Sequence, residues 1–176
     1  AQAVHLAQID RDKQLTPKKI LTPASVENAL RILLAVGGST NAIIHLTAIA
    51  GRLGIPVPLQ QLNTLSDETP VLIDLKPTGD HYMEDLFKAG GLGVVLRELK
   101  PFVTLECLRV TGETLNERLQ SEPAYVNREV VRSFDQPIQK MGGLVSLFGS
   151  LAPGGAILKR SAADPTLFES EGKAVV

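Results

Sequence analysis

The chain has 176 residues, of which 44% are hydrophobic and 21% are charged, and its formal net charge is −1. These values suit an ordinary globular protein of one medium or two small domains, and they argue against overall disorder. Acidic and basic residues alternate without a basic stripe, so we expect no nucleic-acid partner, and no apolar run reaches the roughly 18–20 residues of a membrane span.

The two ends of the chain look like internal sequence. Residues 3–13 are short and mixed, with Val4, Leu6 and Ile9 as a partial helical stripe, and there is no initiator Met or signal segment. The chain closes on Val175-Val176, which is typical of an interrupted strand rather than of a polar terminus. We therefore expect this chain to be a fragment of a larger enzyme.

Two strong helical patterns follow. Thr22 suits an N-cap and Pro23 the first helical position, and apolar residues then recur at helical spacing up to residue 36. Gly37-Gly38 ends this helix, and Ser39 or Thr40 can cap a second one over residues 39–53. The second helix is apolar nearly all round, which predicts that it is buried.

The middle of the chain continues this mixed pattern, and the sequence after Pro101 becomes β-like. The pattern predicts helices over residues 58–65, 82–89 and 92–99 and a strand over 71–75. After Pro101 it predicts a short helix over 113–119 and strands over 102–110, 129–134, 143–148, 156–159 and 173–176. We therefore expect an α/β fold: residues 1–102 as the helical end of an α/β domain, and residues 103–176 as the start of a β-barrel-like domain.

The segment that begins Gly37-Gly38 is the best candidate for a binding site. Glycines allow close approach of a ligand, and the unpaired N–H groups at the start of the next helix favour an anion such as a carboxylate. Ser39, Thr40 and Asn41 would add side-chain donors, which makes them candidate substrate-pocket residues. The alternative is an ordinary glycine-ended helix followed by a capped helix, and local sequence alone favours it.

Other polar residues give weaker signals. His45, on an apolar helix, fits a buried histidine bonded to a carbonyl better than a catalytic base. The loop Lys76–Gly79 either lines a site or simply turns the chain, and Glu84-Asp85 point to different faces of a helix. The single cysteine, Cys107, excludes an internal disulfide and a multi-thiolate metal site, and it indicates a small hydrophobe in a reducing, cytoplasmic compartment. We assign no catalytic residue and no metal ligand within this chain.

Taken together, the motifs resemble the dihydroxy-acid dehydratase and 6-phosphogluconate dehydratase family, which includes the sugar-acid (aldonate) dehydratases. The resemblance extends over nearly the whole chain in one order. It is carried by residues 21–29, Gly-Gly-Ser-Thr-Asn-Ala at 37–42, Asp-Leu-Lys-Pro at 74–77, Met-Glu-Asp-Leu at 83–86, Ala-Gly-Gly at 89–91, Val-Thr-Gly at 110–112 and Leu-Ala-Pro at 151–153.

The resemblance implies a hydro-lyase that converts a 2,3-dihydroxy carboxylic acid into a 2-keto acid, using an iron–sulfur cluster, Mg²⁺ and a serine base. In that family the cluster cysteines and most metal ligands lie upstream of such a segment, and the remaining ligand and the base lie downstream. The implied partner is a small hydroxy acid, and the full-length protein is expected to be a homo-oligomer. For this chain alone we expect no bound cluster, no bound metal and no dehydratase activity.

The resemblance also bears on the substrate. Residues 157–163 and 171–176 are closer to the sugar-acid branch, and a branched-chain dihydroxy-acid dehydratase of valine and isoleucine biosynthesis is the alternative. His81 stands where relatives usually have Tyr, and Ser150 where Asn is common, which indicates a divergent member. A non-catalytic binding or structural module that kept the fold is a further alternative. A nucleotide-binding module is disfavoured, because no Gly-x-Gly-x-x-Gly motif occurs.

Overall fold

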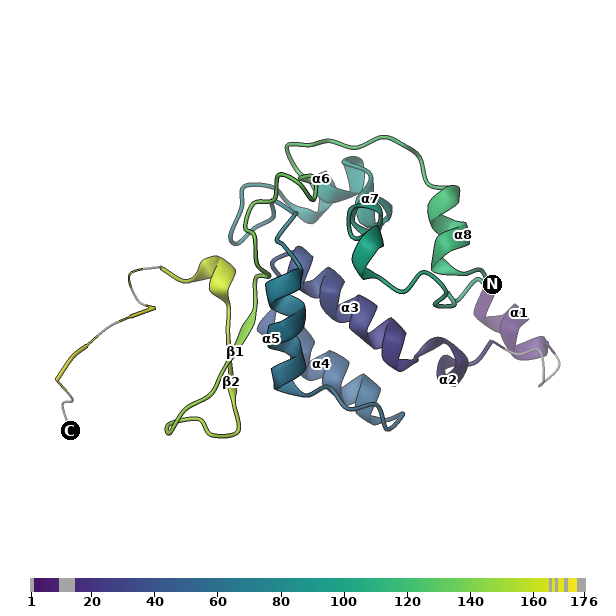
Figure 1. The fold of residues 1–176 in the computed structure, drawn as a ribbon. Coiled ribbons are helices and arrows are strands. Elements are labelled where there is room, and N and C mark those ends of the chain that lie inside the picture. The colour runs from purple at the N-terminus through teal and green to yellow at the C-terminus, as the bar shows by residue number, and fades with distance from the viewer. Residues whose placement is uncertain (1, 10–14, 165, 167, 170, 174–176) are drawn as a thin grey trace.

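The computed structural model describes residues 2–9, 15–164, 166, 168–169 and 171–173. Its elements in chain order are α1 (Gln2–Gln8), α2 (Pro17–Ile20), α3 (Pro23–Ala35), α4 (Thr40–Gly51), α5 (Leu59–Glu68), α6 (Met83–Lys88), α7 (Gly91–Glu98), the 3₁₀ helix η1 (Lys100–Phe102), α8 (Leu115–Gln120), β1 (Val145–Leu147), β2 (Ala156–Leu158) and the 3₁₀ helix η2 (Arg160–Ala162). In Figure 1 the long helix α3 runs through the middle, with α4 and α5 on one side of it and α6, α7 and α8 on the other.

The helix α3 begins as the sequence predicts. Thr22 accepts a hydrogen bond from the N–H of Ser25 at 3.2 Å, and Ser25 Oγ accepts one from the N–H of Thr22 at 2.8 Å. This reciprocal capping satisfies two N–H groups that a helix start otherwise leaves unpaired, and Pro23 lacks the third. The predicted helices over 22–36, 39–53, 58–65, 82–89, 92–99 and 113–119 are confirmed within a few residues as α3 to α8.

The predicted burial of α4 is wrong for this chain. Only Ile43 and Ala50 of this helix are buried, whereas Ile44 is 67% exposed and Ile49 48%. Among the described elements the main neighbour of α4 is α3, which covers one stripe of the helix and leaves the other apolar side chains in solvent. His45, expected to be buried, is exposed for the same reason.

The predicted strands have mixed outcomes. Those over 143–148 and 156–159 are confirmed as β1 and β2, which pair antiparallel with Val145 opposite Leu158. Segments 71–75 and 129–134 reduce to one isolated bridge between Ile73 and Val131 and one between Val71 and Gln139. Most of the segment 173–176 lies outside the described residues.

The predicted strand over 102–110 is wrong. Its backbone carbonyls at Leu105 and Cys107 accept hydrogen bonds from the first N–H groups of α8, so they hold the following helix start instead of a neighbouring strand. The chain is thus mixed α/β, as expected. The described residues contain one sheet of two strands, and the β-barrel and the division at residue 102 stay predictions.

Side chains fasten the β1–β2 hairpin to α5. Asn63 binds the backbone of Ser146 on both sides, with its Nδ2 donating to the carbonyl at 2.8 Å and its Oδ1 accepting from the N–H at 2.6 Å. The buried Ser66 donates to the carbonyl of Leu144 at 2.6 Å. The amide of Asn63 therefore replaces the neighbouring strand that β1 lacks, and it fixes the hairpin on the helices.

The interior consists of two hydrophobic clusters. One lies between α3, α4, α5 and Leu144, and the other lies between α6, α7, α8 and the segments 72–75 and 130–131. Between α3 and α5, the buried Arg31 donates to Glu68 at 2.8 Å and to Glu27 at 3.1 Å, and its guanidinium lies 5.8 Å from the centre of the Phe102 ring. A paired guanidinium can be buried at this position because its donors are satisfied.

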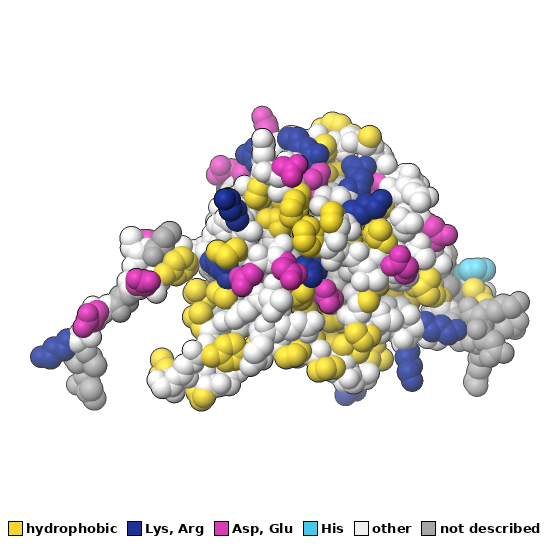
Figure 2. Space-filling model, in the orientation of Figure 1, with side chains coloured by type: hydrophobic (Ala, Val, Ile, Leu, Met, Phe, Trp, Pro, Cys, Tyr) yellow, Lys and Arg dark blue, Asp and Glu magenta, His cyan; other side chains and the backbone are white. Residues whose placement is uncertain are grey.

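The surface carries both charges. On the face shown in Figure 2, lysine and arginine side chains alternate with aspartate and glutamate rather than gathering in one patch. Among the described residues, every helix is too short or too polar to span a bilayer.

Candidate functional site

A hollow of about 170 Å³ lies where three segments distant in sequence meet. We call it the Thr78–Ser161 hollow. Its walls come from the segment 71–80 after α5, the bridge segment 138–139 before β1, and η2; they are Val71, Ile73, Asp74, Thr78, Gly79, Asp80, Ile138, Gln139 and Ser161. From the sequence, the loop Lys76–Gly79 could either line a site or simply turn the chain. In the structure it supplies two of the wall residues, Thr78 and Gly79.

The turn Gly37-Gly38 borders this hollow. Both glycines have positive φ, 71° and 26°, a region that L side chains rarely adopt. A Cβ on Gly38 would lie 2.5 Å from the carbonyl oxygen of Leu33, so only glycine fits at this position. A Cβ on Gly37 would lie 3.7 Å from both Thr78 Oγ1 and Ser161 Oγ. The turn therefore brings the start of α4 next to the hollow.

Ser161 and Gly143 hold this turn from the far end of the chain. Ser161 Oγ donates to the carbonyl of Gly37 at 3.2 Å, and its N–H donates to the carbonyl of Gly143 at 3.2 Å. The N–H of Gly143 in turn donates to the carbonyl of Leu34 at 3.3 Å. The turn directly before Ser39 is thus held by residues more than a hundred positions later in the chain.

The loop below the hollow is held by Asp74. Its Oδ1 accepts from the N–H of Asp80 at 2.6 Å, and it lies 3.6 Å from Nδ1 of His81, a buried nitrogen without a hydrogen-bond partner among the described residues. On the outside of the loop, Lys76 donates to the Tyr82 hydroxyl at 3.0 Å. These bonds keep the loop closed over the segment 71–75, so the hollow has fixed walls.

Ser39, Thr40 and Asn41 lie at the N-terminal end of α4. Ser39 and Asn41 are exposed and Thr40 is half-buried, and none of the three lines the Thr78–Ser161 hollow. Ser39 is the N-cap residue, but its hydroxyl makes no capping bond. Their side chains are therefore available for a ligand, and their role in a substrate pocket stays a prediction. Sequence reasoning did not identify Ser161 as a neighbour, because no local pattern marks a contact across 124 positions.

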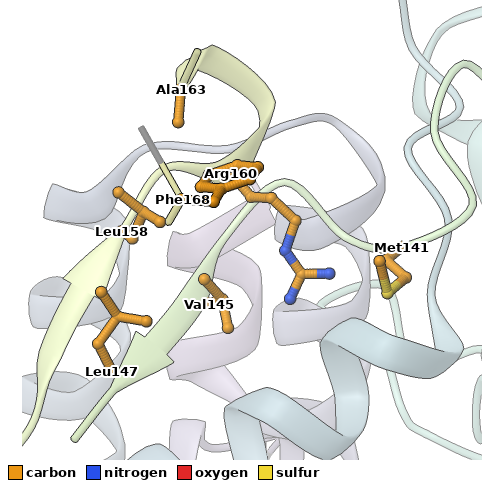
Figure 3. Close-up of a pocket in the computed structure, with 7 residues that line it drawn as sticks. All are labelled: Met141, Val145, Leu147, Leu158, Arg160, Ala163 and Phe168. Carbon is orange, nitrogen blue, oxygen red and sulfur yellow. The ribbon is translucent and has the colours of Figure 1, made fainter. Parts of the chain in front are cut away.

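A second, larger cavity of about 540 Å³ lies on the outer face of the hairpin (Figure 3). Its walls are apolar except for one guanidinium; they are Met141, Val145, Leu147, Leu158, Arg160, Ala163 and Phe168. Arg160 Nη2 lies 3.6 Å from Asp67, and Nη1 is buried without a partner among the described residues. Three of the wall residues, Met141, Leu147 and Phe168, are about half exposed, so this cavity is an open apolar face.

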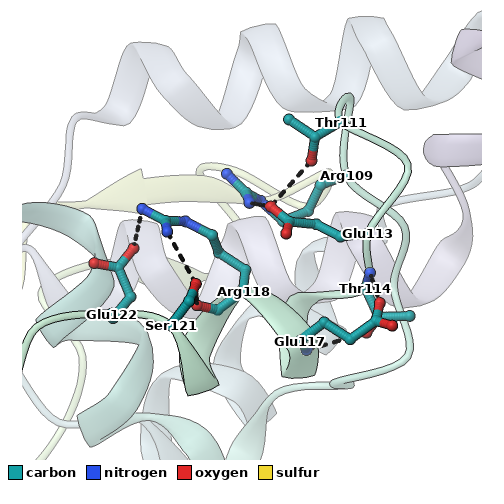
Figure 4. A network of polar contacts seen from close by, with 8 residues as sticks. All are labelled: Arg109, Thr111, Glu113, Thr114, Glu117, Arg118, Ser121 and Glu122. Carbon is teal, nitrogen blue, oxygen red and sulfur yellow. Dashed lines mark hydrogen bonds and ion pairs between the residues drawn. The ribbon is translucent and has the colours of Figure 1, made fainter.

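A polar network surrounds α8 (Figure 4). Arg109 pairs with Glu113, and Arg118 pairs with Glu122 at 2.6 Å. Thr114 and Glu117 form a capping box, and the hydrogen bonds from the N–H and hydroxyl of Thr114 lower the pKa of the Glu117 carboxyl. Both guanidinium groups in the network have carboxylate partners, so we interpret it as structural.

The described part of the chain contains no group of three or more His, Cys, Asp or Glu residues arranged to hold a metal ion. Cys107 is half-buried, and burial together with the nearby Glu106 carboxylate raises the pKa of its thiol. Cys107 does not line the Thr78–Ser161 hollow, whose polar side chains are hydroxyl, amide and carboxylate groups. These groups suit the binding of a ligand.

Comparison with known proteins identifies the chain's relatives. The model of the dihydroxy-acid/6-phosphogluconate dehydratase N-terminal domain matches residues 1–118, and that of the C-terminal domain matches residues 129–176.

Among individual relatives, the L-arabonate dehydratase of Azospirillum brasilense is 46% identical over 165 residues, which are 92% of this chain and 28% of that protein. The dihydroxy-acid dehydratase of Caldanaerobacter subterraneus subsp. tengcongensis is 41% identical over 167 residues, and that of Caldicellulosiruptor bescii is 44% identical over 167 residues. Each of these matches covers 94% of this chain and 30% of the relative. The chain therefore spans less than a third of the length of these relatives.

Proposed function

Because the chain belongs to the dihydroxy-acid/6-phosphogluconate dehydratase family, we propose that it is the middle part of a hydro-lyase. The reaction would remove water from a 2,3-dihydroxy carboxylic acid and give a 2-keto acid. The observation that carries this proposal is the ordered match of both family models, which together cover most of the chain. The relatives named above are dehydratases, which supports the same reaction class.

Within this class we favour a sugar acid as the substrate. The L-arabonate dehydratase is 46% identical, and the two dihydroxy-acid dehydratases named above are 41% and 44% identical. The resemblance of residues 157–163 to the sugar-acid branch points the same way. The branched-chain dihydroxy acids remain the alternative, because the identities to the two kinds of relative are close.

The iron–sulfur cluster and Mg²⁺ that the resemblance implies do not fit the residues of this chain. A cluster needs several thiolates, and Cys107 is the only cysteine. The described residues also lack a group of ligands suited to a divalent ion. If the full-length protein uses these cofactors, their ligands lie in regions that this chain does not include.

The part that we assign to this chain is substrate binding. The N–H groups of Thr40 and Asn41 at the start of α4 have no helical partners, whereas that of Ala42 donates to the carbonyl of Ser39 at 3.0 Å. The positive end of the helix dipole favours a carboxylate there. The side chains of Ser39, Thr40 and Asn41 stand at this end without bonds to other described residues, so they can donate to the same group.

The test uses the full-length protein with Thr40→Val and Asn41→Ala, and Thr47→Val as the control on an exposed position of the same helix. Loss of one charge-assisted hydrogen bond of about 1.5–3 kcal/mol should lower kcat/KM for the hydroxy acid tenfold or more in fully folded protein. Thr47→Val should leave kcat/KM unchanged. If both site variants melt lower but turn over normally per folded molecule, the segment is structural.

The same assay separates the proposal from a non-catalytic module. A full-length protein that dehydrates neither sugar acids nor branched-chain dihydroxy acids after anaerobic reconstitution would support the module. We also propose that the full-length protein is a homo-oligomer. The exposed Ile44 and Ile49 on α4 offer an apolar face that a second subunit, or the rest of the full-length protein, can cover.

A further inference from the structure

We propose that the Thr78–Ser161 hollow receives the hydroxyl-bearing chain of a polyhydroxy acid, and that Ser161 determines the preference for this substrate over an alkyl-branched acid. This inference rests on the proposed function and names the residues that would distinguish its two substrate classes.

The polar groups of the hollow are mostly hydrogen-bond acceptors, and they lie beside the apolar side chains of Val71, Ile73 and Ile138. Ser161 Oγ already donates its hydrogen to the carbonyl of Gly37 at 3.2 Å, and Thr78 Oγ1 donates to the carbonyl of Leu75 at 3.4 Å. Both hydroxyl oxygens therefore have only their lone pairs left, and they can accept hydrogen bonds from a ligand. Asp74 and Asp80 add carboxylate oxygens, which when ionised accept hydrogen bonds and donate none. One oxygen of Asp74 already accepts from the N–H of Asp80. Of the side chains that line the hollow, the Gln139 amide is the one that keeps donors available.

A polyol matches the polar wall of this hollow, and an alkyl chain does not. Each hydroxyl of a sugar acid carries a hydrogen that such acceptors can bind. A methyl or ethyl branch in the same place would remove water from these oxygens without replacing its hydrogen bonds, which is unfavourable. Sites that bond a substrate hydroxyl discriminate strongly against analogues without it. The volume of about 170 Å³ is large enough for a short hydroxylated chain.

The charges also orient the ligand. Asp74 and Asp80 repel an anionic head group, so the carboxylate of the substrate should point away from them. The start of α4 follows the Gly37-Gly38 turn in the chain and favours a carboxylate. Ser161 joins the two regions, because it lines the hollow and also bonds Gly37. One substrate could therefore place its carboxylate at α4 and its hydroxyls in the hollow.

The test measures L-arabonate and 2,3-dihydroxy-3-methylbutanoate with the full-length protein and its Ser161→Ala, Ser161→Thr and Thr78→Val variants. We expect Ser161→Ala and Thr78→Val to raise KM for L-arabonate by about fivefold to tenfold, the effect of one hydrogen bond. Their kcat/KM for the alkyl-branched acid should stay level or rise, and Ser161→Thr should keep most of the preference because it keeps the hydroxyl. Ser150→Ala, at an exposed serine in the hairpin loop, is the matched control.

Direct binding separates this inference from the proposed function. L-arabonate is titrated into the same proteins, with amide chemical shifts of Gly37, Thr78 and Ser161 as the readout. Binding that shifts these amides and weakens in Ser161→Ala supports the hollow, even if the protein dehydrates nothing. Turnover of L-arabonate with equal KM in all variants overturns the hollow while the dehydratase assignment stands. Absence of both binding and turnover overturns both.

Discussion

Replacing Gly143 by alanine should disrupt the contact on which the candidate site is built. Gly143 lies against the backbone of Gly37, and a Cβ at this position would be 2.7 Å from Gly37 Cα and 3.0 Å from its carbonyl carbon and oxygen. Ordinary contacts between carbon atoms are about 3.5–4.0 Å, so the backbone segments around Gly37 and Gly143 must separate by roughly 1 Å. No side-chain rotation can relieve this clash, because all three atoms belong to the main chain.

The loss in free energy of unfolding follows from the clash and from the hydrogen bonds that this separation breaks. The Ser161 bond to Gly37 at 3.2 Å and the Gly143 bond to Leu34 at 3.3 Å would both lengthen beyond hydrogen-bond range. Overpacking costs about 1–3 kcal/mol and each lost bond about 0.5–1.5 kcal/mol. Alanine recovers about 0.4–1 kcal/mol by restricting the unfolded chain. These ranges give a net loss of roughly 1–6 kcal/mol with a middle value of about 3 kcal/mol, which for this chain length lowers Tm by roughly 6–12 °C.

The assay is urea unfolding and thermal melting of Gly143→Ala beside Gly149→Ala. Gly149 has no atom within 4 Å of its Cβ position and no positive φ, so its replacement should be neutral or slightly stabilising. Equal stability of the two variants would refute the contact between Gly143 and Gly37. A Gly143→Ala variant that is less stable by the expected amount, with the slope of the urea transition unchanged, would support it.

Two further predictions concern buried groups away from the site. Arg31→Met should lower the free energy of unfolding by roughly 1–3 kcal/mol in urea titrations, because it leaves the half-exposed Glu27 and Glu68 without their cation. The control Lys88→Met breaks an ion pair between mostly exposed side chains and should change the free energy of unfolding by less than about 0.5 kcal/mol. Equal effects of the two substitutions would contradict this account. Burial and the nearby Glu106 raise the pKa of the Cys107 thiol above its ordinary 9.0, so the midpoint of the pH–rate profile for alkylation by iodoacetamide should be higher in folded than in urea-unfolded chain. Because the pKa of the Cys107 thiol is higher in the folded than in the unfolded chain, its contribution to stability is complete below pH 9.0 and is lost as the pH rises through the folded-state pKa. Coincident alkylation midpoints in folded and unfolded chain would show that the pKa of the thiol is not perturbed.

The sequence by itself determined the helices and the family. Thr22, Pro23 and the apolar spacing after them specify α3 through local bonds and burial of one face, and the glycine pairs at 37–38 and 90–91 mark where helices stop. Such signals are readable because a helix closes its hydrogen bonds within four residues. The same holds for the order of family motifs, which depends on residue identity alone.

Only the tertiary structure decided which residues meet at the candidate site and which apolar faces are covered. The sequence predicted strands over 102–110 and 129–134, but strand pairing depends on a partner elsewhere in the chain, and these segments bond to a helix start and to a single bridge instead. The apolar composition of α4 predicted burial, yet α3 covers only one of its stripes in this chain. Ser161 reaches Gly37, and Gly143 abuts it, because the hairpin is fastened to α5 by Asn63 and Ser66. Contacts across such distances are set by packing of whole elements, and no local periodicity encodes them.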